Sequence, residues 1–194
     1  MSQRRRADHY SHKAKKQGYA ARSVFKLEEI QQRFRVIPRN GRVLDLGCAP
    51  GSWTSFVKKV GGADTVVVGV DINEVPGYLG HQFVASVHDV SVEQLLQALG
   101  GPADLVISDM AQLTTGNRFT DHVRQVELAE QARVIASAVL APGGNFVVKV
   151  FEGEDAPGLV TRIRPDYEKT RRVKPKATRQ ESVEFFVLGM GRKA

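Results

Sequence analysis

VLDLGCAPGSW, which runs from Val43 to Trp53, is the stretch of this sequence that decides the fold. It joins an apolar strand pattern to a glycine-rich turn and the start of a helix, which is the order of a nucleotide-binding βα unit. Gly47 and Gly51 leave room where the main chain must approach a ligand. The stretch has neither the glycine pattern of dinucleotide sites nor the Lys-Ser/Thr of a phosphate-binding loop, so it favours a ligand without a pyrophosphate.

On both sides of this stretch, short β-rich runs alternate with segments of helical periodicity. The predicted strands are residues 42–47, 65–71, 83–87, 103–109, 145–151 and 184–190, the last at or near an edge of the sheet. The predicted helices are residues 19–34, 53–60, 92–99 with Ser91 as its N-cap, 121–140 and 158–164. Strands that are apolar nearly throughout and separated by helices predict a doubly wound α/β fold with a mostly parallel sheet and helices on both faces.

The composition is that of one soluble globular domain, residues 1–194, with a polar and loose N-terminal extension of about residues 1–18. The single cysteine, Cys48, excludes an internal disulfide framework and a cysteine-rich zinc site, and we expect no metal. We expect Cys48 to be buried and inert. With neither a membrane span nor a secretory signal in the pattern, we expect a cytoplasmic protein without membrane contact.

The net charge of +7 is unevenly distributed along the chain. Residues 1–26 hold eight Lys or Arg and one acidic residue, residues 27–160 hold ten and sixteen, and residues 161–194 hold ten and four. A mildly acidic body is therefore flanked by two basic ends, which include the basic stretch 169–179. If the two ends meet on one face, they form a surface for a polyanion such as RNA. The alternative is a solvated tail with basic turns.

Three aspartates follow consecutive predicted strands: Asp71 closes the second, Asp89 the third and Asp109 the fourth. The carboxyl ends of parallel strands form the edge where open α/β sheets bind ligands. Asp71 suits a ribose diol, and Asp89 suits the exocyclic amine of adenine. A single such aspartate is more often a turn former, but three behind a glycine turn favour a ligand site. A ribose and an adenine without a phosphate clamp describe S-adenosylmethionine.

Lys149 lies inside NFVVKVF, residues 145–151, a run that otherwise reads as a buried strand. An unpaired ammonium costs several kcal/mol to desolvate, so a lysine in this setting reaches solvent, is paired, or serves in chemistry. The strand-end aspartates place possible partners near it. We therefore treat Lys149 as a candidate catalytic residue.

The motifs around Gly47 and Trp53, the SDMA of residues 108–111 and the VVKVF of residues 147–151 together resemble the FtsJ/RrmJ family of ribosomal RNA ribose 2′-O-methyltransferases. The similarity runs from residue 15 to residue 193. It implies a Rossmann-like, S-adenosylmethionine-dependent methyltransferase fold with a seven-stranded sheet. It also implies a catalytic tetrad, Lys26, Asp109, Lys149 and Glu184, with Glu181 a rival for the last position, and a cofactor site at Gly47, Gly51, Trp53, Asp71, Asp89 and Asp109.

These residue types suit methyl transfer to a ribose hydroxyl. The sulfonium donor is already activated, so the protein must align the acceptor oxygen and manage its proton. Burial and a cationic cofactor favour the neutral amine of Lys149, whereas Asp109 and Glu184 favour the ammonium. Whether Lys149 acts as a base or orients the hydroxyl therefore stays open.

The leading interpretation is a monomeric enzyme that methylates a uridine of large-subunit (23S) ribosomal RNA, free or in the ribosomal subunit. Transfer RNA or another RNA is an alternative substrate. A methyltransferase acting on amino groups of bases is disfavoured, because residues 108–111 lack the Asp/Asn-Pro-Pro-aromatic pattern of such enzymes. A noncatalytic RNA-binding or ribosome-assembly factor is the alternative from another class, but a pure binder has no need of Lys149.

Overall fold

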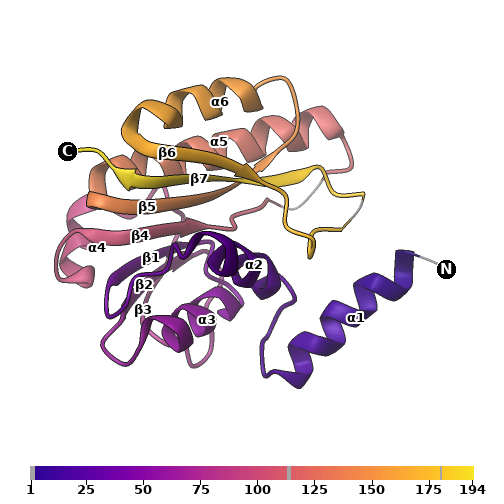
Figure 1. Cartoon of the computed structure of the whole chain (residues 1–194), viewed down its shortest axis with the longest axis horizontal. Coiled ribbons are helices and arrows are strands. Elements are labelled where there is room, and N and C mark those ends of the chain that lie inside the picture. The colour runs from indigo at the N-terminus through magenta and orange to yellow at the C-terminus, as the bar shows by residue number, and fades with distance from the viewer. Residues whose placement is uncertain (1–2, 113–114, 180) are drawn as a thin grey trace.

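The computed structural model describes the main chain of residues 3–112, 115–179 and 181–194 (Figure 1). The strands are β1 (Arg42–Leu46), β2 (Val66–Asp71), β3 (His81–Val84), β4 (Ala103–Ser108), β5 (Leu140–Phe151), β6 (Tyr167–Val173) and β7 (Glu184–Arg192). The helices are α1 (Gln3–Lys16), α2 (Val24–Phe34), α3 (Ser52–Gly61), α4 (Val92–Leu99), α5 (Arg118–Val139), α6 (Ala156–Ile163) and the 3-10 helix η1 (Arg164–Asp166).

The strands form one seven-stranded sheet in the order β3-β2-β1-β4-β5-β7-β6. Strands β1 to β5 pair in parallel, and β7 runs antiparallel to both β5 and β6. The order reverses at β1, whose carboxyl end leads into the glycine turn. This topology confirms the Rossmann-like, mostly parallel sheet. It also places β7 one strand in from the edge.

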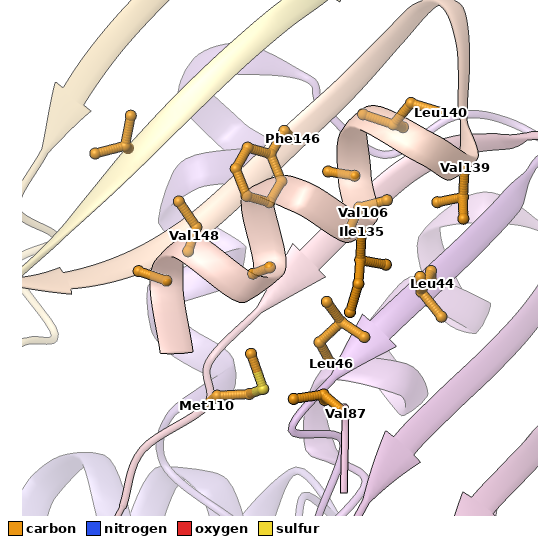
Figure 2. Packing of buried hydrophobic residues seen from close by; sticks show 14 of the residues in the cluster. Leu44, Leu46, Val87, Val106, Met110, Ile135, Val139, Leu140, Phe146 and Val148 are labelled. Atoms are coloured by element: carbon orange, nitrogen blue, oxygen red, sulfur yellow. The ribbon is translucent and has the colours of Figure 1, made fainter. Parts of the chain in front are cut away.

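Each face of the sheet has its own hydrophobic core. Helices α4, α5 and α6 cover one face, where Phe146 and Val148 of β5 belong to the same cluster as Ile135 of α5 (Figure 2). Helices α2 and α3 cover the other face, in a cluster that contains Val147 of β5. Successive β5 side chains alternate between the two cores. Lys149 therefore points to the α2–α3 side, in the row begun by Val147. None of the helices described is long and apolar enough to cross a membrane.

The expectation of a loose N-terminal extension is wrong, because Gln3–Lys16 forms helix α1; Met1 and Ser2 lie outside the described residues. Ala14 is buried at 2% exposure, and the Tyr10 ring packs on Phe25 of α2 with centroids 5.5 Å apart. These residues of α1 are four apart and lie on one side of the helix. An apolar face of this size is too small to show as periodicity in a basic segment. Helix α2 in turn begins at Val24, five residues later than predicted.

Residues 169–173 of the basic stretch belong to strand β6, which the sequence pattern did not reveal. Only Tyr167 and Val173, at the ends of this strand, are buried. The charged residues between them suit an edge strand, where charge prevents pairing with another chain. Strand β3 covers His81–Val84 rather than residues 83–87. Asp89 therefore lies in a turn five residues beyond β3 instead of closing it.

The predicted N-cap at Ser91 is confirmed as a capping box: Ser91 Oγ accepts from the Gln94 N–H at 3.2 Å, and Gln94 Oε1 accepts from the Ser91 N–H at 2.9 Å. We expect Ser91→Ala to lower the free energy of unfolding by about 1 kcal/mol, since an N–H of α4 loses its acceptor. Urea denaturation measures the change. Ser91→Asp, which retains an acceptor, is the control, and equal losses in the two variants would contradict the capping role.

Candidate active site

The turn between β1 and α3 is packed tightly against the end of β4. Gly47 has φ +80°, and a Cβ there would lie 2.8–2.9 Å from atoms of Met110, including its main-chain N and Cα. Gly51, with φ +90°, immediately precedes α3. Glycine is thus required at Gly47 both by conformation and by space. The turn forms a cradle of main chain at the edge where β1 and β4 end.

Asp71, at the end of β2, accepts a hydrogen bond from the main chain of this turn. Its Oδ2 accepts from the Ala49 N–H at 3.0 Å, and its Oδ1 accepts from the Asn73 N–H at 2.8 Å. A carboxylate offers about four acceptor sites, so capacity remains on Oδ2 for a ligand hydroxyl. Asp89, in contrast, is exposed in the turn after β3.

Trp53, which was expected at the cofactor site, has a structural role through its side chain. Its side chain is 4% exposed, its ring packs against Phe186, and its indole N–H donates to the Ser23 carbonyl at 3.0 Å. The adjacent Ser52 Oγ accepts from the Ala21 N–H at 2.7 Å. Together these bonds hold the segment before α2 against the start of α3. The main-chain N–H of Trp53, in the first turn of α3, has no hydrogen-bond partner within the helix.

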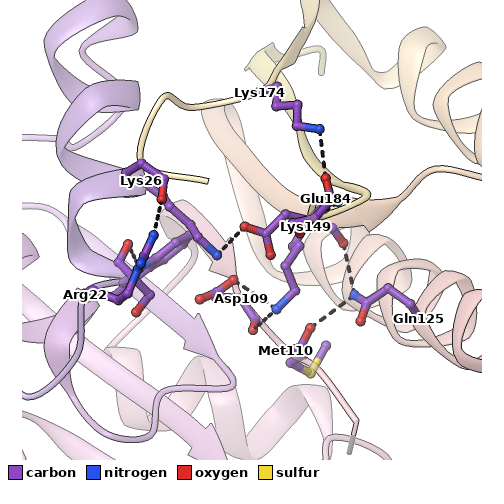
Figure 3. A network of polar contacts seen from close by, with 12 residues as sticks. Arg22, Lys26, Asp109, Met110, Gln125, Lys149, Lys174 and Glu184 are labelled. Atoms are coloured by element: carbon purple, nitrogen blue, oxygen red, sulfur yellow. Dashed lines mark hydrogen bonds and ion pairs between the residues drawn. The ribbon is translucent and has the colours of Figure 1, made fainter. Parts of the chain in front are cut away.

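Two lysine–carboxylate pairs lie side by side next to the cradle (Figure 3). Lys149 Nζ lies 3.0 Å from Asp109 Oδ1 and donates to the Asp109 main-chain oxygen at 2.7 Å. Lys26 Nζ lies 2.5 Å from Glu184 Oε1. All four side chains are 16% exposed or less. The structure thus brings together the four residues that the family resemblance implied.

Strand register explains how distant parts of the chain reach this cluster. Lys149 on β5 pairs with Phe186 on the antiparallel β7, and Phe151 pairs with Glu184. Residues two apart on a strand share a face, so Lys149 and Glu184 project to the same side. Helix α2 packs on that side and supplies Lys26. Glu181, the rival of Glu184, is exposed in the preceding turn.

The pairing of Lys149 with Asp109 leaves acceptor capacity at the site. Although Asp109 Oδ1 is only 3.0 Å from Nζ, no aligned hydrogen bond reaches this buried oxygen among the described residues. The Lys149 Nζ instead donates a hydrogen bond to the Asp109 carbonyl. A buried carboxylate oxygen without a hydrogen bond is costly, so Oδ1 is suited to accept a bond from a ligand.

A second buried network, which the sequence analysis missed, lies behind the cradle. Asp45 of β1 is 1% exposed; the Thr54 hydroxyl donates to its Oδ2 at 2.7 Å and also bonds the Tyr78 hydroxyl at 2.7 Å. Burial, which disfavours the charged form, raises the pKa of Asp45 to about 7, against a lowering by the Thr54 hydrogen bond. Asp45 interrupts an apolar strand as Lys149 does, so the same signal would have found it.

Cys48 in the same region is buried, as expected. Burial raises the pKa of its thiol to about 12, with Asp45 and Asp71 adding to the rise. The thiol stays protonated near neutral pH and is a poor nucleophile. This chemistry agrees with a packing role for Cys48.

The groups along this edge of the sheet fit S-adenosylmethionine. The glycine turn at Gly47 and Gly51 packs closely on Met110 and Val75, Asp71 retains an acceptor site, and Asp109 presents a buried oxygen without an aligned hydrogen bond. Carboxylate acceptors suit a ribose diol and a cationic ligand. No phosphate-binding loop is formed at this turn.

Comparison with known proteins agrees with this fold. The family model described as FtsJ-like methyltransferase matches residues 19–192. "Ribosomal RNA large subunit methyltransferase E" of Syntrophobacter fumaroxidans is 43% identical over 186 residues, 94% of each chain. The protein of the same name from Desulfosudis oleivorans is 41% identical over 98% of this chain and 93% of its own length. A crystal structure of a Plasmodium falciparum protein described as a ribosomal RNA methyltransferase has the same fold, with a TM-score of 0.80 at 22% identity, covering 90% of this chain and 98% of that one.

Fold and site together define a Rossmann-like methyltransferase that uses S-adenosylmethionine as its methyl donor. More particularly, the chain belongs to the FtsJ-like methyltransferase family, whose model spans nearly its whole length.

The raised pKa of Asp45 predicts a dependence of stability on pH. Between pH of about 4 and about 7, the folded protein holds a proton that the unfolded chain has released, so the free energy of unfolding falls as pH rises. The slope approaches about 1.4 kcal/mol per pH unit within this window. Asp45→Asn removes the titrating group, so its unfolding free energy should change less between pH 5 and pH 7 than that of the wild type. Urea denaturation at both pH values tests this, and parallel losses would contradict a raised Asp45 pKa.

Proposed function

We propose that this protein transfers a methyl group from S-adenosylmethionine to the 2′-hydroxyl of a ribose in RNA, at a uridine of large-subunit (23S) ribosomal RNA. The observation that carries the proposal is the pairing of Lys149 with Asp109 beside Lys26 with Glu184, next to the glycine cradle. The relatives named as ribosomal RNA large subunit methyltransferases support the choice of RNA.

In this proposal the cofactor lies along the carboxyl edge of β1, β2 and β4. The main chain at Gly47, Gly51 and Trp53 lines it, and Asp71 accepts from the ribose diol. Asp109 faces the cationic end through its Oδ1. Asp89 would bind the adenine amine from the exposed turn after β3. The bound cofactor supplies an activated methyl group.

Lys149 is the proposed catalytic residue that contacts the target oxygen. One N–H of the Lys149 nitrogen is directed at the Asp109 carbonyl, and the Asp109 carboxylate lies 3.0 Å away without an aligned hydrogen bond. A remaining position of the nitrogen, an N–H of the ammonium or the lone pair of the amine, is left for the 2′-hydroxyl. Either form aligns the hydroxyl, and the amine also takes its proton. Lys26 and Glu184 complete the polar surroundings of the ribose, and their mutual ion pair keeps both side chains in place.

The RNA surface is proposed where the two basic ends of the chain meet. His9 and Tyr10 of α1 line a groove of about 590 Å³ together with Lys174, Lys176 and Arg179 of the β6–β7 connection. Burial lowers the pKa of the Arg22 guanidinium nearby, and the like charge of Arg179 adds to the effect. Cations gathered in this way favour a polyanion, whose phosphates would relieve their repulsion. We infer a monomer, with residues 1–194 as one domain, acting on RNA in the cytoplasm.

Replacing Lys149 tests the catalytic proposal. We expect Lys149→Met to lower the rate of methyl transfer at least about 100-fold, because the variant has no group that aligns or deprotonates the hydroxyl. Cofactor affinity should change little. The assay uses radiolabelled S-adenosylmethionine with large ribosomal subunits or RNA from a methylation-deficient strain, and the modified ribose is mapped.

The matched control is Lys59→Met, which removes an exposed lysine of α3. Wild-type turnover in Lys149→Met would overturn the catalytic proposal. Failure of the wild-type protein on every RNA substrate would instead favour a noncatalytic RNA-binding factor.

Charge removal tests the RNA surface. Lys15 and Lys16 are exposed in the last turn of α1. We expect Lys15→Gln with Lys16→Gln to weaken RNA binding and to make its salt dependence less steep, by about 0.7 in the log–log slope for each phosphate that the variant no longer neutralises. Filter binding across a salt series measures the slope. The control removes two exposed cations of the body, with Arg39→Gln and Lys59→Gln, and equal changes in both pairs would contradict a role for α1.

A further inference from the structure

We propose that Gln125 of α5 is a positioning residue for methyl transfer, because its side-chain amide holds together the main chain of the two strand ends that carry Asp109 and Lys149. The inference rests on the proposed catalytic role of Lys149. Neither the motifs nor the family resemblance pointed to this residue.

Gln125 reaches the site from the layer opposite to α2. Its side chain is 3% exposed, and its Nε2 donates to the Met110 carbonyl at 3.1 Å and to the Lys149 carbonyl at 3.3 Å (Figure 3). One amide group thus uses both of its N–H donors on the two strand ends. Such a pair of hydrogen bonds holds the two strand ends in a fixed position relative to each other.

The need for this bridge follows from the sheet register. The parallel pairing of β4 with β5 ends at Ser108 and Val148. Asp109 and Lys149 are the next residues, so the β4–β5 ladder no longer sets their separation. On the α2 side, Lys149 Nζ donates to the Asp109 carbonyl. On the α5 side, Gln125 bonds the carbonyls of Met110 and Lys149, which closes a ring of hydrogen bonds around the point where the strands part.

A second residue of α5 holds the segment that follows β5. His122 is 8% exposed, and its Nε2 accepts from the Asp155 N–H at 3.3 Å. A Cβ on Gly153 would lie 2.3–2.6 Å from atoms of the His122 ring, so this segment packs directly on the imidazole. His122 lies three residues before Gln125, on the same side of the helix. The N-terminal half of α5 thus contacts the main chain both at Lys149 and just beyond it.

A purely structural role of Gln125 and a positioning role have different effects on the stability and on the rate of the enzyme. A glutamine that only satisfies buried carbonyls contributes to stability, and its removal leaves the rate of the folded enzyme unchanged. A glutamine that sets the geometry of Lys149 and Asp109 affects the chemical step, since small misplacements of reacting groups cost rate steeply. The turnover of folded protein at saturating substrates separates the two.

The first test is Gln125→Met, which keeps the length of the side chain and removes both donors. We expect kcat to fall about tenfold or more, with the KM for RNA and the Kd for S-adenosylmethionine within about twofold of wild type. The control is Gln131→Met, the same change six residues further along α5. Unchanged kcat, or a fall in kcat matched by an equal fall in cofactor affinity, would overturn the proposal.

The second test is Gln125→Glu, which gives the site a titratable group and decides the question even if the methionine variant does not fold. The introduced carboxyl can donate a hydrogen bond when protonated, whereas its ionised form repels both carbonyls. We expect kcat per folded protein, relative to wild type, to fall as pH rises. The neighbouring titratable groups, Asp109, Lys149 and His122, are common to both proteins, so parallel pH profiles would refute the positioning role.

The experiments can refute the proposed function and the proposed role of Gln125 independently. Full activity in Lys149→Met would overturn the proposed function. Loss of activity in Lys149→Met, together with unchanged kcat in both Gln125 variants, would overturn only the role of Gln125.

Discussion

The burial of the Lys149 side chain is the constraint on which the site depends. An ammonium taken into the interior costs several kcal/mol unless it is paired and hydrogen-bonded. Here the compensation comes from one residue, Asp109, through its carboxylate at 3.0 Å and its carbonyl at 2.7 Å. This double interaction ties the end of β5 to the end of β4. The lysine that is proposed to handle the target hydroxyl is therefore also part of what holds the two strand ends together.

The cofactor edge and the proposed target site meet because the strands around β1 and β4 end at the same edge of the sheet. The cradle at Gly47 touches Met110, one residue after Asp109, so the two regions share the end of β4. Both helical layers contribute to this edge: α2 brings Lys26 from one face, and α5 brings Gln125 from the other. Three of the proposed groups, Lys26, Lys149 and Glu184, lie on regular elements, and Asp109 directly follows β4, which suits a reaction that depends on alignment.

In the proposed function, the charged residues that attract RNA are different from those that surround the target hydroxyl. At the proposed site each lysine faces a carboxylate. Lys174, Lys176 and Arg179 of the C-terminal end instead line a groove beside His9 and Tyr10 of α1. A polyanion would be attracted to the groove by charge. The paired lysines of the site keep their geometry through local interactions, so attraction and alignment rest on different residues.

Sequence patterns alone determined the doubly wound fold and the glycine turn, and they singled out Lys149 and Asp109 as candidates, because strand alternation, glycine turns and a charge in an apolar run are local signals. Lys26 and Glu184 came only from family resemblance, since each alone reads as an ordinary surface charge. Tertiary structure decided the rest. Helix α1 and edge strand β6 have apolar faces too small to show in a basic sequence, and Gln125 became visible only where two strands part and leave carbonyls that a third element must satisfy.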